Sequence, residues 1–314
     1  MSVLRLALSP GITALLLLSL SVVWMLKNEK DKARPLLVFG LTLNLLYNWA
    51  FNSFMGKAGS LFHWKYDYYL YLIDKVLGIS AAVVALSFRG FWPVALSVIY
   101  CAMVPMMIFW VLVNPKQDVG SLVRAYAAEL VVGPILYGVM PACGPAYAFG
   151  QVWTHPPAVQ PERIQLSAIP NAFPSLHLAT ALVFVLVAKS RLWRGVSLAF
   201  LAGTALATLT TGEHYVIDLV AGLAFGCFAA SAGSCRIWRA IVYLGITLTW
   251  SLAIRFGVNA LIAYPGAVRL SSILTVLVAL HAVWVEWSAD RSQVPCKQTV
   301  QGEEEMSMPA VTSA

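Results

Sequence analysis

The stretch "IPNAFPSLHLAT" (169–180) places Pro174, Ser175 and His177 at the start of a segment that otherwise reads as an apolar membrane helix. Proline and serine are favoured at helix starts, so Ser175 is the expected N-cap. The first backbone N–H groups of such a helix attract anions. The imidazole of His177 indicates function, because ionisable residues inside membrane helices are costly and are kept mainly at working sites.

The composition around this stretch is that of a polytopic membrane protein. Of the 314 residues, 60% are hydrophobic and only 11% are charged. Apolar segments of roughly 20 residues, long enough to cross a bilayer, predict an all-α bundle of about ten transmembrane helices. They lie at 7–26, 35–55, 68–88, 92–113, 122–142, 175–188, 195–211, 215–233, 240–262 and 269–287. Two are weak, since 68–88 contains Asp74 and Lys75 and 175–188 is short.

These segments divide the chain into four parts. We expect an N-terminal transmembrane hairpin at 1–66, a catalytic helical core at 67–235, a C-terminal hairpin at 236–288 and a disordered polar tail at 289–314. The first helix is expected to be retained, because no small-residue cleavage pattern follows its apolar run.

The net charge of +7 reports membrane orientation and not nucleic-acid binding, because the basic residues stand at the ends of apolar runs. Two turns carry many of them: Lys189, Arg191 and Arg194 in one, and Arg236 and Arg239 in the other. With both turns cytoplasmic, His177 and the stretch at 210–218 face the external, periplasmic or lumenal side of a plasma (inner) membrane or endomembrane. The basic loop "KNEKDKAR" (27–34) conflicts with a ten-helix count, so its side is left open.

The stretch "TTGEHYVID" (210–218) supplies the second set of polar groups. His214 and Asp218 are four residues apart and therefore share one helix face. A carboxylate there can accept from one imidazole nitrogen and leave the other as a nucleophile. His177 reaches the same depth from another helix, where it can protonate a departing oxygen. Together they predict attack on phosphorus through a phosphohistidine.

Other interpretations of these residues stay open. A membrane histidine can serve only to hydrogen-bond neighbouring helices, and the chain could be a transporter or scaffold without chemistry. Two histidines and one carboxylate can also bind iron or zinc, as in a metal-dependent membrane hydrolase. We expect no further metal ligand near these residues, because Glu213 points elsewhere on its helix and the five cysteines show no paired spacing. We therefore expect no metal, no other cofactor and no disulfide framework.

Two motifs carry a family resemblance. "FPSLHLA" (173–179) resembles the second signature of the type 2 phosphatidic acid phosphatase superfamily, and "GEHYVIDLVAG" (212–222) resembles its third; the likeness covers about residues 90–235. The resemblance implies a six-helix phosphatase-like core. It also implies that His214 is the phosphorus nucleophile, that Asp218 orients it, and that His177 protonates the leaving group.

The sequence departs from the superfamily pattern at its cationic positions. Ala207 and Thr208 stand where the third signature usually has Ser-Arg. The first signature, Lys-x₆-Arg-Pro, is missing from "LYGVMPACGPAYAFG" (136–150), and a formal match at 27–35 lies between the first two helices as flanking charge. These departures are similar to the inositol phosphorylceramide synthase and sphingomyelin synthase branch, which transfers phosphate-linked head groups between lipids.

Some other group must then stabilise the phosphoryl oxygens in the transition state. Arg163 in "QPERIQLSAIPN" (160–171) is the first candidate, followed by Asn171, Tyr215 and the helix N-terminus at Ser175. The expected substrate is a phospholipid, a sphingolipid or a polyprenyl phosphate, and the acceptor is water or a lipid hydroxyl. The sequence leaves the oligomeric state open.

Overall fold

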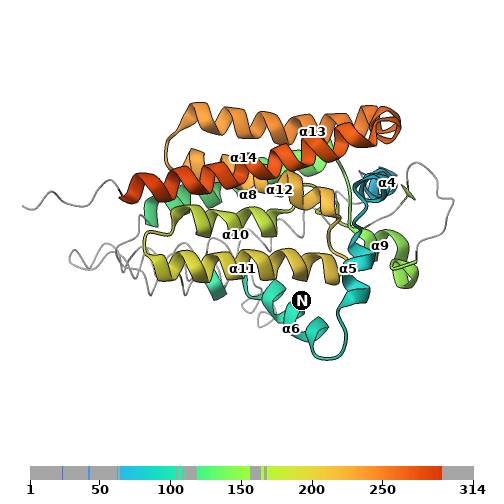
Figure 1. The fold of residues 1–314 in the computed structure, drawn as a ribbon, viewed down its shortest axis with the longest axis horizontal. Helices are drawn as coiled ribbons and strands as arrows, with labels where there is room; N and C mark the ends of the chain where they lie inside the picture. Colours follow the sequence, from blue (N-terminus) through green and yellow to red (C-terminus); the bar gives the residue numbers. More distant parts are fainter. Residues whose placement is uncertain are drawn as a thin grey trace, which may run out of the picture.

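The computed structural model describes residues 23, 42, 62, 64–103, 105–107, 110, 119–155, 164–165 and 168–291. The helices expected at 7–26 and 35–55, the loop at 27–34 and nearly all of the tail at 289–314 lie outside this part of the chain. Figure 1 shows the fold, which is helical apart from one two-stranded ribbon in the described residues.

The described helices follow one another along the chain and share one bundle. In order they are α4 (Asp67–Leu77), α5 (Ala81–Ser87), α6 (Trp92–Cys101), α8 (Val119–Val139), α9 (Pro145–Phe149), the 3₁₀ turn η1 (Gly150–Val152), α10 (Leu176–Val187), α11 (Arg191–Thr210), α12 (Val216–Gly233), α13 (Ile237–Ala263) and α14 (Pro265–Arg291). Strands β1 (Trp64–Lys65) and β2 (Ile164–Gln165) pair antiparallel, with Trp64 opposite Gln165.

Five helices in the described residues are long and apolar enough to cross a membrane: α8, α11, α12, α13 and α14. Helices α4 and α5 would make a sixth span as a bent pair, and α10 is a shorter apolar helix. The chain is therefore a multi-pass membrane protein. The expected count of about ten helices is not confirmed, since the first two lie outside the described residues.

The continuous helix expected at 68–88 is wrong, because the chain bends there by 68°. Gly78 ends α4 in the left-handed conformation, with its N–H on the carbonyls of Asp74 and Lys75. Ser80 then starts α5, its side chain accepting from the N–H of Val83. A left-handed glycine followed by a serine cap is a standard stop and restart of a helix, which the uniform apolarity of the segment concealed.

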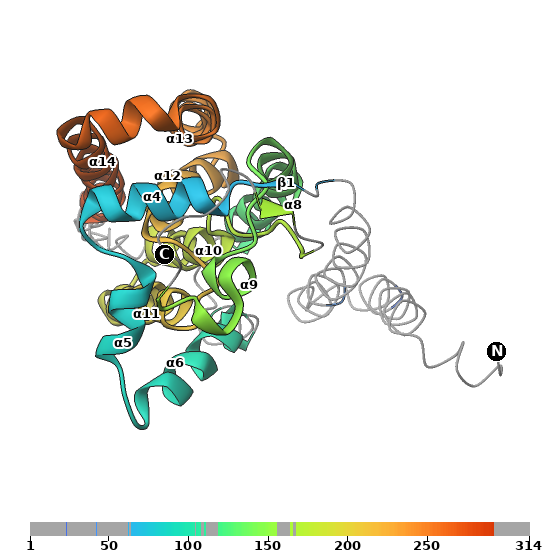
Figure 2. The ribbon, with the colours of Figure 1, turned by 90° about the vertical axis from the view of Figure 1, so that its right-hand side faces the viewer.

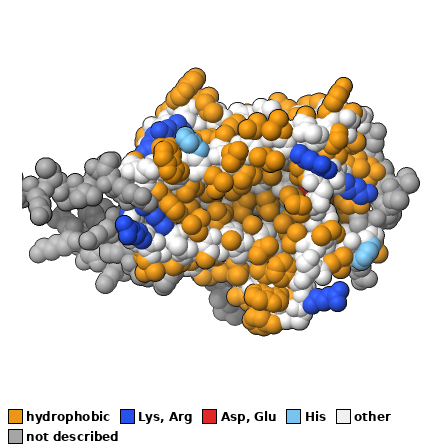
Figure 3. Space-filling model, viewed as in Figure 1, with side chains coloured by type: hydrophobic (Ala, Val, Ile, Leu, Met, Phe, Trp, Pro, Cys, Tyr) orange, Lys and Arg blue, Asp and Glu red, His pale blue; other side chains and the backbone are white. Residues whose placement is uncertain are grey.

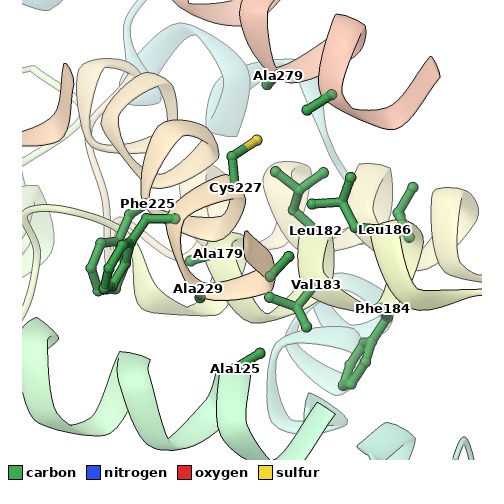
Figure 4. Close-up of a cluster of buried hydrophobic side chains, with 14 of the residues drawn as sticks. Ala125, Ala179, Leu182, Val183, Phe184, Leu186, Phe225, Cys227, Ala229 and Ala279 are labelled. Atoms are coloured by element: carbon green, nitrogen blue, oxygen red, sulfur yellow. The ribbon is translucent and has the colours of Figure 1, made fainter. Parts of the chain in front are cut away.

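Helix α12 is the centre of the bundle. In its most apolar window 72% of residues are buried, against 28–33% in the other four long helices. Gly222 and Gly226 let it touch α10 closely, because a Cβ on either would lie 2.8 Å from the carbonyl oxygen of Ser175 or Ala179. This is the small-residue spacing that brings membrane helices together. Figure 4 shows Ala179 and Leu182 beside Phe225, Cys227 and Ala229 in the resulting core.

The outer surface suits a lipid environment. Large apolar side chains are exposed along the helices, among them Val131, Ile135, Leu252, Phe256, Leu277 and Trp284. In Figure 3 apolar side chains cover the middle of the face, and Lys and Arg lie toward its two ends. The turns after α10 and α12, with their basic residues, lie at one end of the bundle (Figure 1).

The opposite end of the bundle carries the starts of α10 and α12. Figure 2 looks onto this end, where α4 lies across the long helices and α9 lies beside them. Helix α4 contacts α9, α12, α13 and α14. The C-terminal pair α13 and α14 thus packs on the core through both α12 and α4.

Candidate active site

His214 lies in the turn between α11 and α12 and is 3% exposed. Its backbone N–H and that of Glu213 donate to the Thr208 carbonyl, at 3.3 and 3.1 Å. Gly144 presses on this turn from the side. Its φ of 89° requires glycine, and a Cβ there would lie 2.2 Å from the Glu213 carbonyl oxygen. The turn is therefore fixed from two sides before any substrate arrives.

The His214 ring has a defined tautomer. Its Nδ1 lies 2.8 Å from the carbonyl oxygen of Ala172. A backbone carbonyl can only accept, so Nδ1 carries the proton and donates it. The lone pair is then on Nε2, where it is available as a nucleophile.

Asp218 sits behind the same ring, although it is not the hydrogen-bond acceptor that the spacing led us to expect. Its Oδ2 lies 3.5 Å from His214 Nδ1 and accepts from the Tyr215 N–H at 2.7 Å. Its Oδ1 is buried without a protein partner in the described residues. The Ala172 carbonyl therefore orients the ring, and the Asp218 carboxyl group lies behind it.

The protonation state of His214 suits attack on phosphorus. Burial lowers its pKa to about 4, although the nearby Glu213 charge and the bond to the Ala172 carbonyl act in the opposite direction. The imidazole is consequently neutral at physiological pH, with the Nε2 lone pair free of a proton.

His177 meets His214 from α10. The two ring centroids are 6.3 Å apart, and the ring planes are inclined by 61°. The ring of Tyr100 on α6 stacks on the His177 ring with centroids 4.3 Å apart, which fixes the orientation of that imidazole. An attacking nitrogen must come to about 3–3.5 Å from phosphorus, and rings with centroids 6.3 Å apart are close enough to reach the same phosphoryl group.

The two helix starts at the site differ in their free amides. Ser175 caps α10 as the sequence predicts, accepting from the Leu178 N–H at 3.4 Å. Among the described residues, no group accepts from the Leu176 and His177 N–H groups. These two amides are therefore available to an anion. At the start of α12, by contrast, the N–H groups already donate to side chains. The Tyr215 N–H donates to Asp218, and the Val216 and Ile217 N–H groups donate to Asp74.

Asp74 of α4 is a positioning residue that the sequence reasoning missed. Its two oxygens accept from the Val216 and Ile217 N–H groups at 2.9 and 3.1 Å. One carboxylate therefore holds the start of α12, two residues after His214, against the bend between α4 and α5. The signal was present as an acidic residue in an apolar segment, which usually marks function.

Asp67, also on α4, is a second buried side chain whose carboxyl group accepts several hydrogen bonds near the site. It accepts from the Gly144 N–H at 2.9 Å, from the Cys143 N–H at 3.1 Å and from the Tyr215 hydroxyl at 3.1 Å. These bonds tie the segment that presses on Glu213 to the residue that follows His214. Asp67 and Asp74 together make α4 the brace of the site.

The structure places the other residues that were predicted to contact the substrate in different surroundings. The Tyr215 side chain is buried and its hydroxyl is donated to Asp67, so it does not point to a phosphate. Asn171 is partly exposed, next to the Ala172 carbonyl that orients His214. Arg163 lies outside the described residues. Thr208, at the position of the usual arginine, is fully buried and its hydroxyl donates to the Ala205 carbonyl.

Among the described residues, no group of three or more His, Cys, Asp or Glu side chains is arranged to hold a metal ion.

A bundle of apolar helices, with two histidines close together at one end, is the architecture of a multi-pass membrane protein. A sequence model described as the PAP2 superfamily matches residues 69–232, just over half of the chain, and the chain belongs to that superfamily. The matched region starts in α4 and so includes Asp74. Members of the superfamily are generally phosphatases, which supports an enzyme. No match was found among curated proteins or among solved structures.

Proposed function

We propose that the protein breaks a phosphoester or phosphoanhydride bond of a membrane lipid through a phosphohistidine on His214. The observation that carries this proposal is the locked ring of His214: its Nδ1 is bound to the Ala172 carbonyl, and it lies across from His177. The ring is neutral, fixed and adjacent to a second proton-carrying group, which is what nucleophilic catalysis at phosphorus requires.

The reaction runs in two steps. The Nε2 lone pair of His214 forms a bond to phosphorus while the bond from phosphorus to the leaving oxygen breaks. The anionic phosphoryl group bound beside His177 favours the protonated form of that imidazole, which gives its proton to the leaving oxygen. The phospho-imidazole is then cationic, and Asp218 stabilises it from 3.5 Å. In the second step His177 takes a proton from the acceptor hydroxyl, whose oxygen displaces His214 from phosphorus.

We further infer that the acceptor is a lipid hydroxyl, as in the inositol phosphorylceramide synthase branch. A phosphodiester head group carries less charge than a phosphate monoester, and so it needs less cationic stabilisation. Position 208 offers no cation, because Thr208 is buried and its hydroxyl is satisfied within its own helix. The α10 amides supply neutral hydrogen-bond donors in place of an arginine.

The proposed site faces the external, periplasmic or lumenal leaflet. The turns with Lys189 and Arg191, and with Arg236 and Arg239, lie at the other end of the bundle. Short basic turns stay on the cytoplasmic side of membranes.

Product analysis tests this function. Purified protein in nanodiscs would receive phosphatidylinositol labelled with ³²P, with or without ceramide. A transferase moves the label to a ceramide-based lipid only when ceramide is present, and a phosphatase releases it in water-soluble form in both cases. His214→Ala should do neither, whereas His281→Ala, an exposed histidine on α14, should match the wild type. Unchanged turnover in His214→Ala would refute the proposal.

A further inference from the structure

A second candidate binding site lies on the outer side of α12, where the C-terminal helix packs against the family core. An apolar groove of about 410 Å³ runs between α14, the first turns of α12 and the bend between α4 and α5. Val216 and Val220 form the α12 wall, and Leu77 and Ile79 form the wall at the bend. The α14 wall lies beyond residue 232, where the superfamily match ends.

The α14 wall carries two polar groups on one helix face. Arg269 is exposed, and its Nε donates to the Val76 carbonyl at 2.8 Å. The terminal nitrogens of this guanidinium have no protein partner among the described residues. Ser272, three residues further, is 6% exposed, and its buried hydroxyl has no hydrogen-bond partner in the described part of the chain. A buried hydroxyl without a hydrogen bond costs free energy, so Ser272 indicates a ligand in the groove.

The polar and apolar groups follow the depth profile of a lipid. Arg269 is the fifth residue of α14, so it lies near the membrane interface, and Ser272 lies about 4.5 Å deeper along the helix. Val276 and Leu277 continue the same face one turn beyond Ser272. Among the described residues, the groove lining contains no acidic side chain to neutralise Arg269.

We propose that this groove holds one anionic phospholipid of the bilayer. Its phosphate lies on the Arg269 guanidinium, an ester carbonyl accepts from the Ser272 hydroxyl, and one acyl chain lies along Val276 and Leu277. Charge complementarity selects an anionic head group, since a guanidinium forms paired, charge-assisted hydrogen bonds with phosphate. This site is separate from the His177–His214 pair, and the proposal does not depend on the proposed function.

The bound lipid also affects the candidate active site at His214. Arg269 binds the Val76 carbonyl in the last turn of α4, and Asp74 lies two residues earlier on α4. Asp74 in turn holds Val216, which is part of the groove wall. A lipid between α14 and Val216 therefore stabilises the brace that fixes the start of α12 after His214.

Native mass spectrometry measures this binding without any assay of turnover. The full chain would be taken from nanodiscs of equal phosphatidylcholine and phosphatidylglycerol and examined for retained lipid. The wild type should retain one phosphatidylglycerol. Arg269→Gln should lower that occupancy by roughly tenfold, as expected for loss of a charge-assisted hydrogen bond, and Ser272→Ala should lower it several-fold.

Matched controls separate this effect from general loss of charge or polarity. Arg89→Gln removes an exposed arginine elsewhere, and Ser271→Ala removes the neighbouring exposed serine, which lies outside this groove. Both should bind as the wild type does. Equal retention of the two lipids by the wild type would overturn the proposal. Equal phosphatidylglycerol retention by Arg269→Gln and Arg89→Gln, or a second protein copy in place of lipid, would also overturn it.

Discussion

The close contact between α10 and α12 offers a direct test of how packing sets the geometry of the site. In Gly222→Ala the new Cβ would lie 2.8 Å from the Ser175 carbonyl oxygen and 3.3 Å from the Ser175 Cβ. A carbon and a carbonyl oxygen normally stay about 3.3 Å or more apart, so the helices must separate by roughly 0.5 Å. His177 is two residues from Ser175, and this separation moves it away from His214.

The expected losses are in both stability and rate. Overpacking of this kind costs about 1–3 kcal/mol of unfolding free energy. Because a misplacement of about 1 Å can cost 10²-fold in rate, half that displacement predicts about a tenfold slower phosphoenzyme formation. The assay is single-turnover labelling, together with thermal unfolding in detergent.

Gly245→Ala on α13 is the matched control, since a Cβ there meets nothing within 4 Å. Alanine is a better helix former than glycine by about 1 kcal/mol, so this variant should be at least as stable as the wild type and equally fast. If Gly222→Ala labels as fast as Gly245→Ala, the helix contact does not set the distance between the histidines.

Three further predictions concern single groups. His177→Ala should slow transfer from a natural lipid by about 10² to 10⁴ but slow labelling from an activated aryl phosphate ester much less, because a good leaving group needs no proton; equal losses would contradict the acid role. Burial lowers the His214 pKa to about 4, so labelling from the aryl ester should fall only below about pH 4. The unfolding free energy should meanwhile decrease as pH drops below 6.5, since only the unfolded chain then binds this proton; a rate midpoint near 6.5 would contradict a buried neutral ring. Asp74→Ala leaves two buried N–H groups unpaired, at about 1–3 kcal/mol each, and Asp74→Asn, which keeps one acceptor, should lose about half as much in thermal or denaturant unfolding; equal losses would contradict the brace.

The sequence predicted the helical core and the proximity of the two histidines because both depend on local patterns. His177 begins one apolar run and His214 precedes another, and a hairpin of two helices returns the chain to the same end. The distance of 6.3 Å between the rings agrees with that reasoning. The roles of these residues stay predictions, and so do the helices expected at 7–26 and 35–55.

The acceptor for the His214 ring could not be predicted in the same way. A backbone carbonyl such as that of Ala172 has no signature in the side-chain pattern, whereas an aspartate four residues on does. The roles of Asp67 and Asp74 depend on α4 crossing the end of the bundle, a tertiary arrangement that helical periodicity does not contain. Gly78 and Ser80, two residues apart, were a readable signal of the bend, but the apolar length of the segment outweighed it.

The central claim is that phosphorus becomes bonded to His214. Rapid mixing of the protein with ³²P-labelled lipid in excess EDTA, followed by denaturation at alkaline pH and peptide mapping, measures this directly. The account predicts one labelled peptide containing His214, with a label stable to base and released by acid. It also predicts no label in His214→Ala and normal labelling in His281→Ala. A label that persists in His214→Ala, or labelling that vanishes in EDTA and returns on adding one divalent metal, would contradict it.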